Sequence, residues 1–245
     1  MLKKIALITG ANKGIGFETA KQLGEKGITV LIGARNKENG EKAAKKLQDL
    51  GIDAAFVEVD IANSSKFTSV YNFIESKYGK LDILINNAGI SADGGGWGAN
   101  TTTTISEENL KKTFDTNFFG VVLLTNTLLP LIKKSEAGRI VNLSSILGSL
   151  SLHLDKNSGI YESNLFAYNA SKTALNAYTV HLAVALEGTK IKVNSAHPGW
   201  VKTDMGTDAA PMQIEDGAKT SVALALLDED GPTGKYIHLG NEIPW

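Results

Sequence analysis

The stretch Ile5-Ala6-Leu7-Ile8-Thr9-Gly10-Ala11-Asn12-Lys13-Gly14-Ile15-Gly16 decides the fold of this 245-residue chain. An apolar run is followed at once by three glycines, and helical spacing of apolar residues then continues to Lys26. Residues without a Cβ let the backbone approach a pyrophosphate and present N–H groups at the positive end of a helix. The stretch therefore predicts a phosphate-binding turn between a strand and a helix. The alternative is a plain connecting turn without a ligand. The glycines are spaced as Gly-x-x-x-Gly-x-Gly, which departs from the commoner dinucleotide-binding pattern Gly-x-Gly-x-x-Gly.

Short apolar runs alternate with longer amphipathic stretches along the rest of the chain. Continuous apolar runs are typical of strands covered on both faces, and alternating strands and helices favour a doubly wound sheet. We expect strands at Ile5–Thr9, Thr29–Ile32, Ala54–Val59, Ile83–Asn86, Arg139–Leu143, Lys192–Ala196 and Tyr236–Leu239, and helices at Ile15–Lys26, Glu38–Leu50, Lys66–Tyr78, Leu110–Lys133, Phe166–Leu186 and Glu215–Leu227. The prediction is an α/β fold, a single Rossmann-type doubly wound domain over residues 1–245. Its seven-stranded parallel sheet is flanked by helices on both faces.

Composition excludes several classes of protein. The 25 Lys and Arg residues balance 26 Asp and Glu residues, so the formal net charge is −1 and no basic face suits a phosphate backbone. Without Cys there is no disulfide framework and no thiolate nucleophile, and four scattered His residues cannot form a metal cluster. The apolar run Ile5–Ile8 is short for a signal peptide, and Thr116–Ile132 is short for a membrane span. We expect a cytoplasmic protein with no metal, nucleic-acid or membrane partner.

The end of the second expected strand bears on the choice of dinucleotide. An acid about 20 residues past the glycines usually accepts the adenosine ribose hydroxyls of NAD. Here the segment reads Gly33-Ala34-Arg35-Asn36, with no acid before Glu38. A guanidinium can bind a 2′-phosphate through paired charge-assisted hydrogen bonds, and Lys13 could reach the same group. The sequence predicts NADP(H) as the cofactor, unless Arg35 and Lys13 are solvated surface cations.

Polar side chains also follow other strands of the expected sheet. Asp60 comes after the third strand, where it could bond an adenine amino group or act as a turn residue. The fourth strand ends in Asn86-Asn87-Ala88-Gly89, and its amides could tie strand ends together while small residues let a flat cofactor pass. Ser145 follows the fifth strand and can hydrogen-bond a carbonyl oxygen, or be an ordinary turn residue. No Gly-x-Ser-x-Gly elbow supports a hydrolase.

Tyr168 and Lys172 lie near the start of a long helical pattern. The i,i+4 spacing puts the phenol and the ammonium on one helix face. A neighbouring cation favours phenolate and would bring the phenol pKa toward neutrality, which suits proton transfer. The pair alone is a weak signal, because many helices pack a Tyr and expose a Lys by chance. We interpret the four His residues as structural, because none of them has the sequence context of a catalytic triad.

The ordered set of motifs resembles the short-chain dehydrogenase/reductase family over nearly the whole chain. The set comprises Thr9–Gly16, Asn86–Gly89, Asn117, Ser145, Tyr168, Lys172 and Pro198-Gly199. Four further stretches look like the NADPH-dependent carbonyl reductase branch: Asn12–Gly16, Thr116–Gly120, Leu129–Ile132 and His197–Met205.

The resemblance implies a role for each motif residue. Tyr168 would be the general acid, Ser145 would polarise the carbonyl, and Lys172 would lower the tyrosine pKa and bind the nicotinamide ribose. Asn117 would support a water linking Lys172 to solvent, or would be a buried amide satisfied by backbone. The implied cofactor-binding residues are Gly10, Asn12, Lys13, Gly14, Ile15, Gly16, Arg35, Asp60, Ile61, Asn87, Ala88, Gly89, Tyr168, Lys172, Pro198, Gly199, Val201 and Thr203.

Two irregular segments bear on the substrate. Ser145 and Tyr168 are 23 residues apart, so this chain carries a small insertion at about 147–165 relative to the commoner family pattern. The insertion would wall the substrate pocket and obstruct tetramers, which favours a monomer or dimer, or it is a tolerated surface insertion. A substrate loop is expected at about 199–213. The residues assigned to the pocket are Ser145, Trp97, Leu147 and Trp200, which favour apolar or aromatic carbonyl compounds.

The function implied is NADPH-dependent reduction of ketones or aldehydes to alcohols, within EC 1.1.1.-. One alternative is an NADP-dependent alcohol dehydrogenase acting on a hydroxysteroid or a 3-hydroxyacyl substrate. The other is a catalytically idle NADP-sensing protein.

Overall fold

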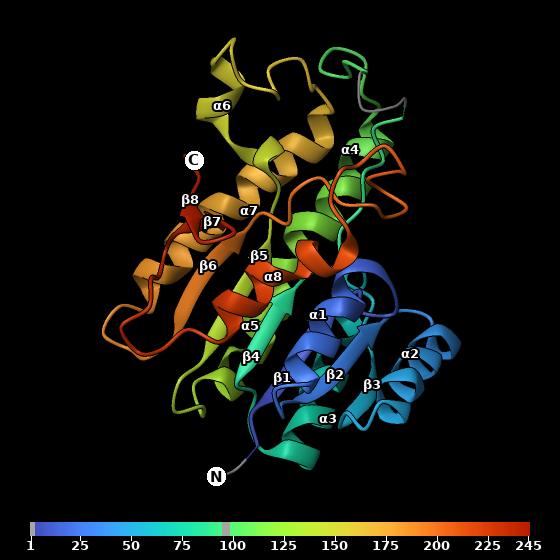
Figure 1. Cartoon of the computed structure of the whole chain (residues 1–245), viewed down its shortest axis with the longest axis vertical. Helices are drawn as coiled ribbons and strands as arrows, with labels where there is room; N and C mark the ends of the chain where they lie inside the picture. The colour runs from blue at the N-terminus through green and yellow to red at the C-terminus, as the bar shows by residue number, and fades with distance from the viewer. Residues whose placement is uncertain (1–2, 95–98) are drawn as a thin grey trace.

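A computed structural model describes residues 3–94 and 99–245 (Figure 1). Its centre is one sheet with the strand order β3-β2-β1-β4-β5-β6-β7-β8. The strands are β1 (Ile5–Thr9), β2 (Thr29–Ala34), β3 (Ala54–Glu58), β4 (Ile83–Asn86), β5 (Arg139–Leu143), β6 (Lys192–Ala196), β7 (Tyr236–His238) and β8 (Asn241–Glu242). The first seven pair in parallel at the expected positions. The chain order reverses on either side of β1, which is the switch point where such sheets bind ligands.

The eighth strand departs from the expected seven-stranded sheet. β8 pairs antiparallel with β7 through a two-residue turn at Leu239 and Gly240. Both turn residues have positive φ, 45° and 86° respectively, which matches the twist of a tight hairpin. Sequence periodicity could not reveal a strand of two residues.

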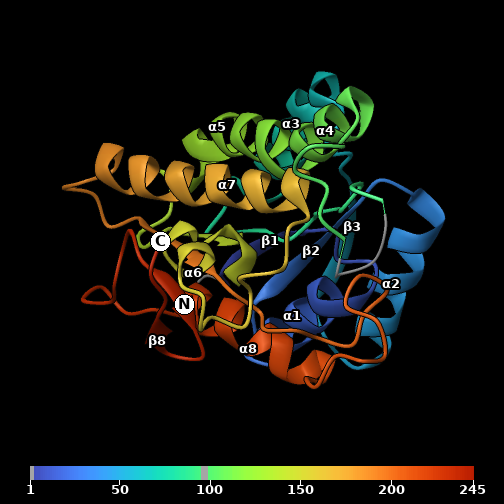
Figure 2. The same cartoon turned by 90° about the horizontal axis from the view of Figure 1, so that it is seen from above.

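Helices cover both faces of the sheet, as Figure 2 shows from above. α1 (Gly14–Gly24), α2 (Lys37–Asp49) and α8 (Ile214–Ala225) lie on one face; α3 (Phe67–Tyr78), α4 (Glu107–Phe114), α5 (Gly120–Ile132) and α7 (Phe166–Ala185) lie on the other. Alternate residues of each strand point to opposite layers: Leu7 packs with the α3, α5 and α7 layer, while Ile8 packs with the α1, α2 and α8 layer. Both faces are therefore apolar, which explains the continuous apolar runs.

The helix expected over Leu110–Lys133 is divided. A π-helical turn, Asp115–Phe119, separates α4 from α5. The whole helical run Glu107–Ile132 has 26 residues and a mean hydropathy of 1.3, enough by length and composition to span a membrane. Part of this run packs into the core of the protein, including Leu124 and Leu128. The apolar residues on both sides of this turn were interpreted as one helical pattern, so the break was not predicted.

The insertion at 147–165 contains a short helix, α6 (Leu150–Leu154), after a 3₁₀ turn, Ile146–Gly148. The Ser149 hydroxyl caps α6 by accepting from Leu152 N at 3.2 Å, and it donates to Pro244 O at 2.7 Å. Ser151 donates to Trp245 O through both its backbone N–H and its hydroxyl. The C-terminal segment therefore holds α6 in place.

Candidate active site

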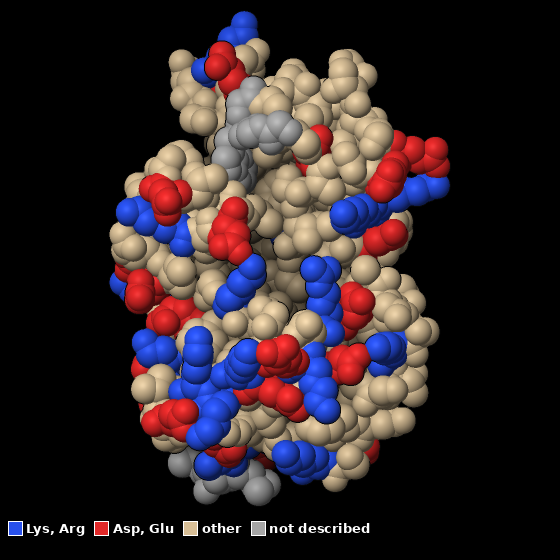
Figure 3. Space-filling model, turned by 90° about the vertical axis from the view of Figure 1, so that its right-hand side faces the viewer, with Lys and Arg blue, Asp and Glu red and all other residues tan. Residues whose placement is uncertain are grey.

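A cavity of about 1570 Å³ opens at the carboxyl ends of the strands. On the side of the molecule shown in Figure 3, Lys and Arg side chains flank a hollow in the surface. The volume exceeds the roughly 300–1,000 Å³ of a drug-sized ligand site, so it can hold a dinucleotide together with a small substrate. The lining contains every residue assigned to the cofactor from the sequence, and it also contains Ser145 and Trp200. Their binding roles stay predictions.

The glycine turn has the backbone shape that a diphosphate needs. Gly10 and Gly14 have φ values of 65° and 59°, a region that side chains other than glycine rarely adopt. A Cβ on Gly16 would lie 2.4 Å from Asn87 Nδ2, so only glycine lets α1 begin this close to the end of β4. Asn87 Nδ2 in turn donates to Thr9 O at 2.8 Å. Gly14, Ile15 and Gly16, the first residues of α1, line the cavity. The first N–H groups of a helix have no partner within the helix, so this position suits a diphosphate.

The two cations assigned to the 2′-phosphate differ in their surroundings. Arg35 is exposed at the cavity rim and forms no ion pair with the residues that the structure describes. Lys13 forms an ion pair with Asp204, across the cavity in the expected substrate loop. Asp204 is therefore a rim residue that sequence reasoning missed. Its 191-residue separation from Lys13 left no local signal. Arg35 is the better candidate for binding a phosphate.

Tyr168, Lys172 and Ser145 lie together in the lining of the cavity. The Lys172 Nζ lies 5.6 Å from the centre of the Tyr168 ring and donates to Leu143 O at 2.7 Å. Burial raises the pKa of Tyr168 to about 12, while a hydrogen bond with the Ser145 side chain acts in the opposite direction. Burial also lowers the pKa of Lys172 to about 8. The net shift of the phenol pKa is upward, because removal of the phenol from water dominates, and the expected effect of Lys172 on this pKa stays a prediction.

Asn117 lies in the π turn and is fully buried. Its Oδ1 accepts from Ile90 N at 2.8 Å, and its Nδ2 donates to Ile90 O at 2.8 Å and to Ser171 Oγ at 3.0 Å. This is the backbone-satisfied amide that the sequence left open as the alternative. Asn117 does not line the cavity. Its side chain ties the segment after Gly89 to α7.

His197 holds two parts of the site together. Its Nδ1 accepts from Ile146 N at 3.2 Å, next to Ser145, and from Gly199 N at 3.4 Å. Burial, with a smaller contribution from His238, lowers its pKa to about 3. A neutral imidazole can keep accepting these bonds at physiological pH, which agrees with a structural role.

The residues assigned to the substrate pocket are not all at the cavity. Trp200 lines it, and its indole N–H donates to Gly206 O at 2.7 Å. Leu147 does not line it; the side chain packs with Ile160, Leu165 and Tyr168 behind the phenol. Trp97 lies outside the described residues. The insertion therefore packs against Tyr168 from behind, and Met205 adds apolar surface to the lining.

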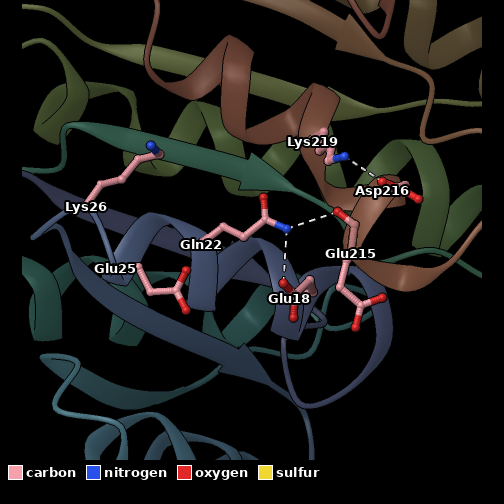
Figure 4. Close-up of a pocket in the computed structure, with 7 residues that line it drawn as sticks. All are labelled: Glu18, Gln22, Glu25, Lys26, Glu215, Asp216 and Lys219. Carbon is pink, nitrogen blue, oxygen red and sulfur yellow. Dashed lines mark hydrogen bonds and ion pairs between the residues drawn. The ribbon is translucent and has the colours of Figure 1, made fainter.

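A second depression lies between α1 and α8, away from this site (Figure 4). Two interactions join its lining residues: Gln22 Nε2 donates to Glu18 Oε1 at 3.0 Å, and Lys219 pairs with Asp216 at 2.6 Å. Among residues 3–94 and 99–245, no cluster of three or more His, Cys, Asp or Glu residues could hold a metal ion.

Comparison with known proteins agrees with this geometry. The sequence model of the family described as short chain dehydrogenase matches residues 4–214. Carbonyl reductase [NADPH] 1 of Mus musculus is 34% identical over 281 residues, an alignment that covers 99% of each chain. The solved structure of carbonyl reductase Sniffer of D. melanogaster has a TM-score of 0.83 at 29% identity and full coverage of both chains.

A short chain dehydrogenase from Shigella flexneri, solved in complex with NADP, has a TM-score of 0.82 at 26% identity over 96% of each chain. The fold, the glycine turn and the Ser145, Tyr168 and Lys172 arrangement thus occur together with a family match over most of the chain. The chain belongs to the short-chain dehydrogenase/reductase family of NAD(P)-dependent oxidoreductases.

Proposed function

We propose that the protein reduces ketones or aldehydes to alcohols with NADPH, as a carbonyl reductase-like member of EC 1.1.1.-. The observation that carries this proposal is that Ser145, Tyr168 and Lys172 line the same cavity as the glycine turn. This arrangement supports proton transfer close to the position that we expect for the nicotinamide ring.

When bound, the cofactor supplies a hydride to the carbonyl carbon. The Ser145 hydroxyl donates a hydrogen bond to the carbonyl oxygen and thereby polarises it. Tyr168 gives its phenolic proton to that oxygen as negative charge develops there. The Lys172 ammonium stabilises the resulting phenolate, while its bond to Leu143 O keeps it directed at the site.

The protonation state of Tyr168 suits a reduction. With a pKa of about 12 the phenol is protonated at neutral pH and can serve as an acid. Alcohol oxidation, the alternative for a hydroxysteroid or 3-hydroxyacyl substrate, requires the phenolate as base. An idle NADP sensor would have no need of this acid and its supporting cation, since cofactor binding alone would suffice.

The preference for NADPH is supported by Arg35, which reaches the cavity rim without an acidic partner. Carboxylates that could accept ribose hydroxyls are absent from residues 33–36, in the described segment at the end of β2. The Mus musculus relative is named for NADPH, which agrees with this assignment.

The substrate class is argued from the apolar wall of the cavity. Trp200, 45% exposed, and Met205 line it beside Ser145. Because the Trp200 N–H already bonds Gly206 O, the ring offers an apolar face rather than a donor. Aromatic and other apolar carbonyl compounds match this lining better than charged sugars do.

The experiment is an NADPH-oxidation screen against aromatic ketones, quinones, ketoesters, steroid ketones and acyl thioesters, repeated with NADH. We expect turnover with NADPH on at least one apolar carbonyl class and much weaker turnover with NADH. Silence across the panel, with NADPH binding intact by fluorescence titration, would contradict the proposal and support the sensing alternative.

A further inference from the structure

The helix that carries Tyr168 and Lys172 has no cap of its own. The residue before α7 is Leu165, which provides no side-chain cap, and no acidic residue lies in the first turn. The first N–H groups of a helix have no partner within the helix, so those of α7 must be satisfied from elsewhere.

Those partners come from the loop between β4 and α4. Phe166 N donates to Thr101 Oγ1 at 2.8 Å. Ala167 N donates to Asp93 Oδ1 at 2.8 Å, and Tyr168 N donates to Asp93 Oδ2 at 3.0 Å. The backbone of the catalytic tyrosine itself is thus held by a carboxylate 75 residues earlier in the chain.

Asp93 is 7% exposed, and donors surround its carboxylate. Besides the two backbone N–H groups, it accepts from Thr101 Oγ1 at 2.9 Å and from Ser91 Oγ at 3.3 Å. The positive end of the α7 dipole faces the same charge. Charge-assisted bonds of this kind are shorter and stronger than neutral ones, so the carboxylate fixes the start of the helix firmly.

The loop that carries Asp93 also borders the cofactor site. Gly89, Ser91 and Ala92 line the cavity, and Asn117 binds both backbone groups of Ile90. Asp93 itself does not line the cavity. One segment therefore connects the nicotinamide side of the cavity to the backbone of Tyr168.

We propose that Asp93 is a positioning residue: by holding the first turn of α7, it sets the Tyr168 phenol against Ser145 and the substrate carbonyl. This inference rests on the proposed function and adds to it a residue outside the cavity. Because proton transfer depends steeply on alignment, a misplacement of about 1 Å can cost about 100-fold in rate. Loss of the carboxylate should therefore lower kcat, while the predicted diphosphate and 2′-phosphate contacts at the glycine turn and Arg35 stay intact.

The test compares Asp93→Ala and Asp93→Asn with a matched control, Asp82→Asn. Asp82 is equally buried and accepts from Ile5 N at 2.8 Å and Ser135 Oγ at 2.6 Å, at the opposite end of the sheet. For each variant, kcat, KM and the NADPH Kd are measured at a temperature where circular dichroism shows a folded protein. Amide hydrogen exchange is followed at residues 166–168.

We expect Asp93→Ala to lower kcat by about 30- to 100-fold, with the NADPH Kd within about threefold of wild type. Asp93→Asn keeps one acceptor oxygen, so its kcat should lie between those of wild type and Asp93→Ala. Both should exchange faster than wild type at residues 166–168. Asp82→Asn should lose stability while keeping its kcat within about twofold and its protection at residues 166–168.

A folded Asp93→Ala with kcat within about threefold of wild type would overturn the inference, and so would one in which only the NADPH Kd changes. If Asp93→Ala does not fold, the same criteria apply to Asp93→Asn. If wild type reduces nothing in the screen, the proposed function fails and the exchange measurement alone decides. Unchanged protection at residues 166–168 in Asp93→Asn then overturns the role of Asp93 in holding α7.

Discussion

Tyr168 and Lys172 are both buried, and burial moves their pKa values in opposite directions. The pKa of the phenol rises to about 12 and that of the ammonium falls to about 8, because in each case the charged form loses hydration. In the proposed reduction the phenol would be protonated at the start, beside a cation that titrates close to physiological pH. The cation would then limit the pH range of the reaction.

The rate of reduction should fall as the pH rises through about 8. Below that value Lys172 carries the charge that stabilises the Tyr168 phenolate; above it the amine is neutral, while the phenol stays protonated until about pH 12. The measurement is kcat/KM, determined from initial rates between pH 5.5 and pH 10. A value of kcat/KM that stays constant up to pH 10 would contradict the assignment of the decrease to Lys172.

Arg35→Asp should reverse the preference for NADPH. Losing charge-assisted bonds worth roughly 1.5–3 kcal/mol to the 2′-phosphate predicts a drop of about tenfold or more in the NADPH:NADH ratio of kcat/KM. Lys37→Asp is the matched control, because Lys37 is exposed, pairs with Glu41 and lies outside the cavity lining. An unchanged ratio in Arg35→Asp would show that Arg35 is a surface cation only.

At the scale of elements, the 3₁₀ turn Ile146–Gly148 packs directly against α7. A Cβ on Gly148 would lie 2.9 Å from the backbone carbonyl carbon of Lys172, which cannot move without shifting the helix. Gly148→Ala should therefore cost about 1–3 kcal/mol of unfolding free energy and lower kcat. Gly159→Ala, in the same insertion with no atom within 4 Å of the added Cβ, should do neither.

Urea denaturation and steady-state kinetics on the two alanine variants check this contrast. Equal stability and equal kcat for Gly148→Ala and Gly159→Ala would mean that the insertion does not bear on the position of α7.

Helices and strands with regularly spaced apolar residues could be predicted from the sequence. Elements whose structure depends on distant contacts could not. The ranges of β1, β4, β5 and β6 follow from their apolar runs, because both faces of the sheet are covered. The π turn, α6 and β8 are too short to produce a period. Asp93 carried no signal, since a cap supplied 75 residues away looks in the sequence like an ordinary loop acid.

At the scale of the whole molecule, the sheet order brings the motifs together. Parallel strands β1, β4 and β5 are neighbours, so the glycine turn, Asn86–Gly89 and Ser145 all emerge at one edge. Asn86 Nδ2 donates to Asn142 Oδ1 at 2.8 Å, tying two of these strand ends as the sequence suggested. Site placement was predictable because the topology follows from βα alternation; the Lys13–Asp204 pair and the pKa of Tyr168 were not, because they depend on loop packing and depth of burial.

Assembly is a prediction at the same scale. We expect a monomer or a dimer, because the insertion that carries α6 would obstruct the helix face many relatives use to form tetramers. Exposed Leu150 and Leu154 mark its outer side. Sedimentation velocity across a tenfold range of concentration measures this. A stable tetramer would contradict the obstruction.

The central claim is that Tyr168 supplies the proton in an NADPH-dependent reduction. The most direct measurement is kcat for Tyr168→Phe, on the best carbonyl substrate of the screen, at saturating NADPH and with the NADPH Kd determined in parallel. The account predicts a kcat at least about 100-fold below wild type, because the acid is gone, with the Kd within about twofold, because Phe keeps the packing. A Tyr168→Phe variant that retains more than about a tenth of wild-type kcat would contradict it.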